Sequence, residues 1–204
     1  MFTAPVIGLI GKKRSGKDTF AQVLVDEFGY RRVAFADPLR AVALAADPYV
    51  RIEADEFGPV GFTGGAAFSQ QTHCRLSTLV EFVGWERAKE ARDVRRFLQR
   101  LGSEGIRSIA PTFWVDTALR TIADTDDPVV VTDVRFPNEA NALRALGGTL
   151  VRIVRPGTDT ADAHASETAL DGYAEDYRVN NAADVATLHE VARVIAHAVA
   201  DRTV

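Results

Sequence analysis

Residues 11–19, with the sequence GKKRSGKDT, hold glycine, lysine and hydroxyl side chains at a spacing that suits phosphate binding. Gly11, four intervening residues, Gly16 and Lys17 satisfy the pattern GxxxxGK. In this pattern, backbone N–H groups and the N-terminus of the next helix converge on phosphate oxygens, and the lysine reaches the β and γ phosphates. The residues predicted to bind the nucleotide phosphates are Gly11, Lys13, Arg14, Ser15, Gly16, Lys17, Asp18 and Thr19.

One position of this loop departs from the usual pattern. Asp18 follows the lysine where serine or threonine is usual, and Thr19 carries the hydroxyl one place later. The form GKDT resembles the GKGT of nucleoside monophosphate kinases more than the loops of GTPases and motor ATPases. Thr19 is therefore a candidate ligand of a metal ion or of phosphate. Asp18 either belongs to the site or is a first-turn carboxylate that the helix dipole favours.

A second candidate group lies in the sequence VVVTDVRFPNE, residues 129–139. Asp133 stands at the carboxyl end of an apolar run, where a strand of an α/β sheet would present an aspartate to Mg²⁺. Arg135 follows and would neutralise a transferring phosphoryl group, whose negative charge spreads over its oxygens. The alternatives are a cap or turn role for Asp133 and a surface ion pair for Arg135.

The elements that must position these residues alternate between strands and helices. Helical periodicity follows Lys17 up to Gly29 and again over residues 137–146 and 184–200, the last behind Asp184 as a cap. Strands separated by helices predict an α/β fold with a mostly parallel five-stranded sheet flanked by helices. The predicted strands are residues 5–11, 31–36, 129–134, 149–155 and 177–180.

These patterns predict a single domain whose core is interrupted by two inserted segments. The core comprises residues 1–36, 127–155 and 177–204, and residues 37–126 form a helical insertion with a Gly-rich stretch at 57–65. The polar segment 156–176 carries few large apolar residues and is expected to form a mobile lid.

Composition narrows the class of protein. A chain of 204 residues with 47% hydrophobic residues can bury one sizeable core. The net charge of -4 gives no overall positive field of the kind that drives nucleic-acid binding, so no direct nucleic-acid partner is expected. Cys74 is the single cysteine and cannot form an internal disulfide, and no apolar run is long enough to span a membrane. These features predict a cytoplasmic protein.

Taken together, the motifs resemble those of the bacteriophage deoxynucleoside monophosphate kinases. The ordered series is GKKRSGKDTFA, FADPLR, FLQRLGSEGIR, FWV, VVVTDVRFPNEANAL and HASE, and it spans nearly the whole chain. The resemblance implies ATP and Mg²⁺, a deoxynucleoside monophosphate acceptor, a diphosphate product, and a P-loop kinase fold with an acceptor-binding region and a lid. It also suggests a homodimer acting, if phage-encoded, in the host cytoplasm.

On that basis, the insertion supplies the acceptor-binding residues. Asp37 and Arg40 of FADPLR would bind a sugar hydroxyl and the acceptor phosphate, since arginine suits bidentate contact with phosphate. Gln99, Glu104 and Arg107 would surround a glycine bend as base reader, sugar or arginine partner, and phosphate clamp. The alternative for Asp37 and Arg40 is the capped start of a helix with the arginine in solvent. The alternative for the other three residues is that they are ordinary surface residues.

Aromatic and lid residues complete the predicted site. Trp114 would either stack on the base or exclude a ribose hydroxyl, or else pack in the core. Arg155 is expected on one face of the fourth strand with Arg152, and would reach the transferring group when the lid closes and excludes water. His164, Ser166 and Glu167 match the family's lid motif by resemblance only.

A further pair of candidate residues stands at the end of the fifth strand. Asn180 and Asn181 could bound the adenine pocket through backbone contacts, although asparagine pairs are also ordinary turn formers.

The mechanism predicted on this basis uses Lys17, Asp133, Arg135 and Arg155 as catalytic residues, with Mg²⁺ organised around Thr19 and Asp133. No general base is required, because the acceptor phosphate is already ionised at neutral pH. Two rivals stay open. One is a P-loop kinase for another phosphorylated small molecule, such as phosphomevalonate or dephospho-coenzyme A, and the other is a nucleic-acid-dependent ATPase.

Overall fold

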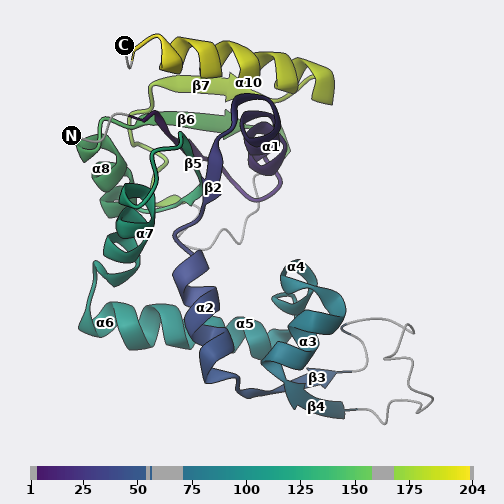
Figure 1. Ribbon diagram of the computed structural model, residues 1–204. Helices are drawn as coiled ribbons and strands as arrows, with labels where there is room; N and C mark the ends of the chain where they lie inside the picture. The colour runs from purple at the N-terminus through teal and green to yellow at the C-terminus, as the bar shows by residue number, and fades with distance from the viewer. Residues whose placement is uncertain (1–3, 54–55, 57–70, 158–167, 203–204) are drawn as a thin grey trace. The chain divides into compact units, whose positions relative to one another are not determined.

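The computed structural model describes residues 4–53, 56, 71–157 and 168–202 (Figure 1). Its chain divides into two compact units, one formed by Met1–Ala36 with Val115–Val204 and the other by Asp37–Trp114. The Gly-rich stretch at 57–65 and the motif at 164–167 lie outside the described residues. Among the described helices, none combines the length and the apolarity that crossing a bilayer demands.

The first unit is built on a five-stranded parallel sheet with the order β2-β5-β1-β6-β7. The prediction of a mostly parallel sheet of five strands is confirmed. The three central strands, β5, β1 and β6, are buried over nearly their whole length because helices cover both sides, whereas the edge strands β2 and β7 carry exposed arginines. Their bounds are Val6–Ile10 for β1, Arg31–Val33 for β2, Val129–Val134 for β5, Thr149–Val154 for β6 and Tyr177–Asn180 for β7.

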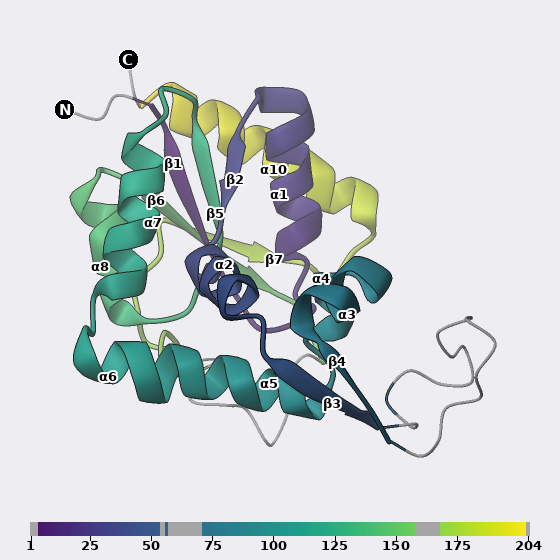
Figure 2. The same ribbon diagram turned by 60° about the horizontal axis from the view of Figure 1, so that its bottom comes forward.

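Helices cover both faces of this sheet (Figure 2). Helix α1 (Lys17–Phe28) and α10 (Val185–Ala200) pack on one face, and α7 (Phe113–Ala123) and α8 (Pro137–Ala145) contribute to the core on the other. The predicted cap of α10 is confirmed, because Asp184 accepts a hydrogen bond from the Thr187 N–H at 2.8 Å.

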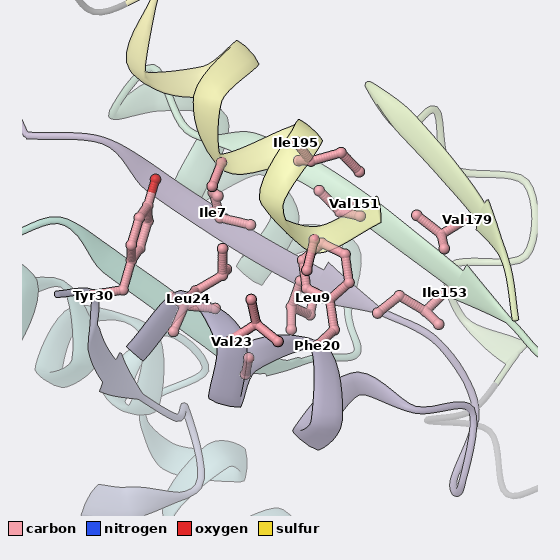
Figure 3. Packing of buried hydrophobic residues seen from close by; sticks show 14 of the residues in the cluster. Ile7, Leu9, Phe20, Val23, Leu24, Tyr30, Val151, Ile153, Val179 and Ile195 are labelled. Carbon is pink, nitrogen blue, oxygen red and sulfur yellow. The ribbon is translucent and has the colours of Figure 1, made fainter. Parts of the chain in front are cut away.

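The core beneath α1 fixes the helix that follows the phosphate-binding loop (Figure 3). Phe20 and Leu24 of α1 are fully buried against Ile7 and Leu9 of β1 in one cluster that also includes Ile195 of α10. Replacing Phe20 by alanine would cost about 3–5 kcal/mol, since a buried aromatic leaves a cavity. This packing therefore holds Lys17, one turn earlier, against the loop.

The second unit contains an antiparallel hairpin that the sequence did not predict. Strand β3 (Tyr49–Glu53) pairs with β4 (Gln71–Arg75), with Val50 opposite Cys74. The hairpin packs with helices around a small core, and the helices of this unit are α2 (Asp37–Ala46), α3 (Leu76–Val83), α4 (Trp85–Ala88), α5 (Arg92–Gln99), the π-helix η1 (Arg100–Ile106) and α6 (Arg107–Ile109).

The structure differs from two further expectations about the insertion. The second unit ends at Trp114 and not at residue 126, because Val115, Ala118 and Ile122 of α7 belong to the core of the first unit. The expected glycine bend is absent from the described residues 99–107, where α5, η1 and α6 follow one another without a break. Gly102 lies inside this helical run, and a Cβ there would be 3.0 Å from a Leu39 methyl, so glycine allows α2 to approach.

Candidate phosphate-binding and catalytic site

The loop between β1 and α1 adopts a conformation suited to an anion. Arg14 and Gly16 have φ angles of 64° and 105°, in the left-handed region, and Gly16 caps α1 without a side-chain hydrogen bond. The first N–H groups of a helix have no partner within it, and the helix dipole adds positive potential there. Together these features make the start of α1 a favourable place for phosphate oxygens.

Both glycines of the motif are required by their surroundings. A Cβ on Gly11 would lie 2.4 Å from the Ile153 carbonyl oxygen, and one on Gly16 would lie 2.4 Å from Asn181 Nδ2. Real Cβ atoms do not approach other atoms so closely, and the φ of Gly16 is unfavourable for any side chain as well. The glycines that suggested the motif therefore allow both the turn and its close packing.

The loop also fixes its lysine. Lys17 Nζ donates hydrogen bonds to the carbonyl oxygens of Gly11 and Lys12, each at 2.7 Å, which places the ammonium group over the loop. Ser15 is buried, and its hydroxyl has no hydrogen-bond partner among the described residues. Asp18 is exposed and Thr19 is half-buried in the first turn of α1. The loop, the lysine and the hydroxyl groups fit a polyphosphate.

A cavity of about 500 Å³ adjoins the first half of this loop. It lies at the carboxyl ends of the strands, where open α/β sheets bind ligands. Its charged lining is mostly cationic, with one carboxylate, Asp171, among the described residues that form it. The cationic residues are Lys12, Lys13, Arg135, Arg152, Arg155 and Arg178.

Two arginines of this cavity have different environments. Arg152 is 7% exposed, forms an ion pair with Glu175 at 3.0 Å, and donates to the carbonyl oxygens of Leu170 and Tyr173. Arg155 is exposed and lies after the end of β6, so the expectation that both share one face of the strand is wrong. Side chains of a strand alternate with a period of two, and positions three apart cannot share a face.

Asp133 serves as an anchor within the first unit. Its carboxylate accepts the backbone N–H groups of Phe35 at 2.7 Å and Ala36 at 3.0 Å, directly after β2. The structure thus gives Asp133 a role that resembles the cap or turn role named above as its alternative, because the carboxylate binds free backbone N–H groups where a strand ends. Its role as a Mg²⁺ ligand stays a prediction, and the described residues contain no group of three His, Cys, Asp or Glu side chains that could hold a metal alone.

Arg135, two residues later, is exposed and lines the cavity. Its backbone N–H and that of Phe136 donate to the buried Glu139 carboxylate, at 2.7 and 3.1 Å, in a capping box at the start of α8. Glu139 therefore fixes the backbone that presents Arg135.

In the second unit, Arg40 stands within a small charged cluster. Its guanidinium lies 3.3 Å from Glu86 and 3.8 Å from Asp37, and it stacks 5.9 Å from the centre of the Trp85 ring. These contacts orient a side chain that is 27% exposed. Glu86 and Trp85, at the start of α4, were not among the site residues predicted from the sequence, and no motif in the sequence marks them.

The remaining predicted acceptor residues lie along the helical run from α5 to α6. Gln99 and Glu104 are exposed, Glu104 pairs with Arg100 at 3.7 Å, and Arg107 is half-buried. The π-helical turn between them is a feature often found at functional sites.

Trp114 has a packing role in the structure. It is 3% exposed, and its Nε1 donates to the Gly102 carbonyl at 3.1 Å. Of the two alternatives for this residue, the structure supports the core one, because neither the ring face nor the indole N–H is available at a surface.

The sheet order β2-β5-β1-β6-β7, with the glycine-containing loop of residues 11–16 joining the central strand to a helix, defines an α/β fold of the P-loop kinase type. The family model for deoxynucleotide monophosphate kinase matches residues 66–191. The chain belongs to this family. The predicted family and the predicted enzyme class, a kinase that phosphorylates deoxynucleoside monophosphates, are confirmed.

Individual relatives agree with this membership. The protein of Acanthamoeba polyphaga mimivirus named "putative deoxynucleotide monophosphate kinase" is 30% identical over 171 residues, which cover 81% of each chain. The deoxynucleotide monophosphate kinase of Enterobacteria phage T4 is 25% identical over 210 residues, covering 81% of this chain and 87% of that protein. Among solved structures, a dephospho-CoA kinase from Campylobacter jejuni gives a TM-score of 0.46 at 12% identity over 97% of this chain and 98% of that chain.

Proposed function

We propose that the protein transfers the γ-phosphoryl group of ATP to the phosphate of a deoxynucleoside monophosphate, with Mg²⁺ as cofactor. The observation that carries this proposal is the loop itself. Lys17 is held between the Gly11 and Lys12 carbonyl oxygens beside a cation-lined cavity of about 500 Å³. A family of nucleotide kinases requires a donor site of this chemistry.

The donor phosphates would bind the loop from Lys13 to Thr19, with Lys17 at the β and γ phosphates. Arg135 and Arg155 line the neighbouring cavity and would neutralise the transferring group. Phosphoryl transfer passes through a loose transition state, so preorganised positive charge supplies much of the catalysis.

Mg²⁺ would be held by the Thr19 hydroxyl and the Asp133 carboxylate together with ATP oxygens, and would neutralise phosphate charge when bound. Mg²⁺ commonly uses only one or two protein ligands beside substrate phosphates, so these two residues suffice. Asp133 accepts two backbone N–H groups, and these bonds hold its carboxylate at the carboxyl end of β5.

The acceptor would bind in the second unit. Arg40 and Arg107 supply guanidinium groups for its phosphate, and Asp37, Gln99 and Glu104 supply polar contacts for sugar and base. An oxygen of the ionised acceptor phosphate forms the new P–O bond as the bond from the γ phosphorus to the bridging oxygen breaks, and ADP leaves. No proton has to be removed from the nucleophile.

The segment 156–176 is proposed as the lid that excludes water during transfer. Of this segment, 156–157 and 168–176 lie among the described residues, and the HASE residues do not. A homodimer and a location in the host cytoplasm are part of the same proposal, and the location derives from the likeness to phage kinases.

The proposal is tested by coupled ADP release with Mg·ATP against the four deoxynucleoside monophosphates and their ribose counterparts, with products identified by mass. Phosphomevalonate and dephospho-coenzyme A serve as rival acceptors, and added DNA tests for a stimulated ATPase. We expect deoxynucleoside diphosphates and no stimulation by DNA. Turnover of a rival acceptor alone would overturn the acceptor site and leave the donor site intact.

A further inference from the structure

The side chain of Asn181, just after β7, ties the end of the sheet to the phosphate-binding loop. Its Nδ2 donates a hydrogen bond to the Ser15 carbonyl oxygen at 2.9 Å, across 166 positions of sequence. Ser15 is 1% exposed and Asn181 is 9% exposed. The backbone N–H of Asn181 in turn donates to the Val154 carbonyl at 2.7 Å, so the residue is fixed to the end of β6.

We infer that Asn181 is a positioning residue for the donor phosphates, an inference that rests on the proposed function. The hydrogen bond acts on the peptide between Ser15 and Gly16. In a planar trans peptide, the C=O and N–H groups point in opposite directions. When Asn181 holds the Ser15 carbonyl, it therefore turns the Gly16 N–H away from itself.

The Gly16 N–H is one of the groups on which phosphate binding at this loop depends. Gly16 is the N-cap of α1, and backbone N–H groups at such a position bind phosphate oxygens. Asn181 thus determines the direction of a phosphate-binding donor while touching no phosphate. Its effect should fall on the polyphosphate part of the donor and not on the acceptor.

The loop needs such a restraint because its backbone is unfavourable by itself. Ser15 stands between Arg14 and Gly16, whose φ angles of 64° and 105° lie in the left-handed region. Glycine adopts such angles readily, but at Arg14, which carries a Cβ, this conformation persists only where the surroundings hold it. Asn181 provides a restraint from outside the loop, and its Nδ2 also occupies the space where a side chain at residue 16 would lie.

A wall of the adenine pocket is the competing role for Asn181. The structure favours positioning, because the side chain is buried and its Nδ2 is engaged by Ser15, whereas the neighbouring Asn180 lines the cavity. The two roles predict different effects. A pocket wall would affect binding of the whole nucleoside, whereas a positioning residue affects only the phosphates.

The test uses Asn181→Leu, which keeps the branched shape and removes the donor. Calorimetry measures the affinities for Mg·AMP-PNP and for adenosine, steady-state kinetics give kcat and both KM values, and thermal unfolding monitors the fold. We expect about tenfold weaker AMP-PNP binding, which is what loss of a buried hydrogen bond commonly produces. The adenosine affinity and the acceptor KM should stay within about twofold of wild type.

The matched control is Asn141→Leu, which removes an exposed hydrogen bond from the Tyr173 hydroxyl and should leave AMP-PNP binding unchanged. If Asn181→Leu does not fold, Asn181→Ser should show the same selective loss. Equal losses for AMP-PNP and adenosine, or no loss for either, would overturn the positioning role. A wild-type protein that phosphorylates no deoxynucleoside monophosphate would instead defeat the proposed function.

Discussion

The carboxylate of Asp133, at the end of β5, accepts the backbone N–H of Phe35 at 2.7 Å, although 98 positions along the chain separate the two residues. The other oxygen accepts the Ala36 N–H at 3.0 Å. One aspartate thus fixes the backbone where β2 leaves the sheet, and the same side chain is the proposed ligand for Mg²⁺. The two roles can be separated by experiment.

Asp133→Asn should lower the free energy of unfolding by about 1–3 kcal/mol, because its NH₂ group would face a backbone donor and leave it unpaired. Urea unfolding measures this change. Asp127→Asn, at an exposed acid that accepts from Thr125, should stay within about 0.5 kcal/mol of wild type. If Asp133→Asn lowers the stability but leaves the Mg²⁺ dependence of activity unchanged, Asp133 only fixes the backbone after β2. If the stability is unchanged, Asp133 does not have that anchoring role.

Lys17→Met should reduce kcat at least about 100-fold, the usual result of removing a charge-stabilising donor from a transition state. The fold should survive, because Lys17 donates its hydrogen bonds to the Gly11 and Lys12 carbonyl oxygens to fix its own loop and not to join distant elements. Single-turnover rates and circular dichroism measure the two quantities. Arg193→Met, which removes an exposed ion pair with Glu27, is the control and should leave turnover unchanged. Normal turnover by a folded Lys17→Met protein would remove Lys17 from the catalytic residues.

Local patterns in the sequence predicted the sheet and the loop because each depends on neighbouring residues. Buried parallel strands are continuously apolar, and the glycine and cap signals at Gly29 and Asp184 mark helix ends. The hairpin β3–β4 was missed although Tyr49–Glu53 alternates exposed and buried residues. Between the end of β3 at Glu53 and the start of its partner strand at Gln71 lie 17 residues, so no short turn signal joins the two.

Contacts between distant segments could not be predicted from one sequence. The bonds from Asn181 to Ser15 and from Phe35 to Asp133 join residues 166 and 98 positions apart, and no periodicity encodes them. Trp114 could not be assigned for a different reason. An aromatic residue in a helical stripe gives the same sequence pattern whether it packs in the core or stacks on a ligand. Only its burial and its bond to Gly102 separate the alternatives.

Arg40→Gln should raise the KM for the deoxynucleoside monophosphate about tenfold or more, while the KM for ATP changes by less than about twofold. The reason is that glutamine cannot supply the paired donors with which a guanidinium binds phosphate. Initial rates with each substrate varied in turn measure the two constants. Arg95→Gln, at an exposed arginine of α5, is the matched control. Equal effects of Arg40→Gln on both constants would move Arg40 out of the acceptor site.

Glu175 links the buried Arg152 at 3.0 Å to the exposed Arg178 at 2.7 Å. Burial raises the pKa of Glu175, but hydrogen bonds from Arg178 and Arg152 outweigh it, and the net pKa is lowered from its ordinary 4.5. A carboxylate whose folded pKa is depressed stabilises the fold fully above its unfolded pKa. That stability should be lost as pH falls through the lower folded value.

Glu175→Ala should therefore cost about 3 kcal/mol of unfolding free energy at pH 7, because it leaves the Arg152 guanidinium buried without its counter-ion. Arg178→Ala breaks only the exposed half of the cluster and should cost less than about 1 kcal/mol. Urea unfolding between about pH 7 and pH 3 should show the wild-type advantage over Glu175→Ala shrinking below the ordinary pKa of the carboxyl group. An advantage that stays constant over this range would mean that Glu175 stabilises the protein by packing, since lost packing does not depend on protonation.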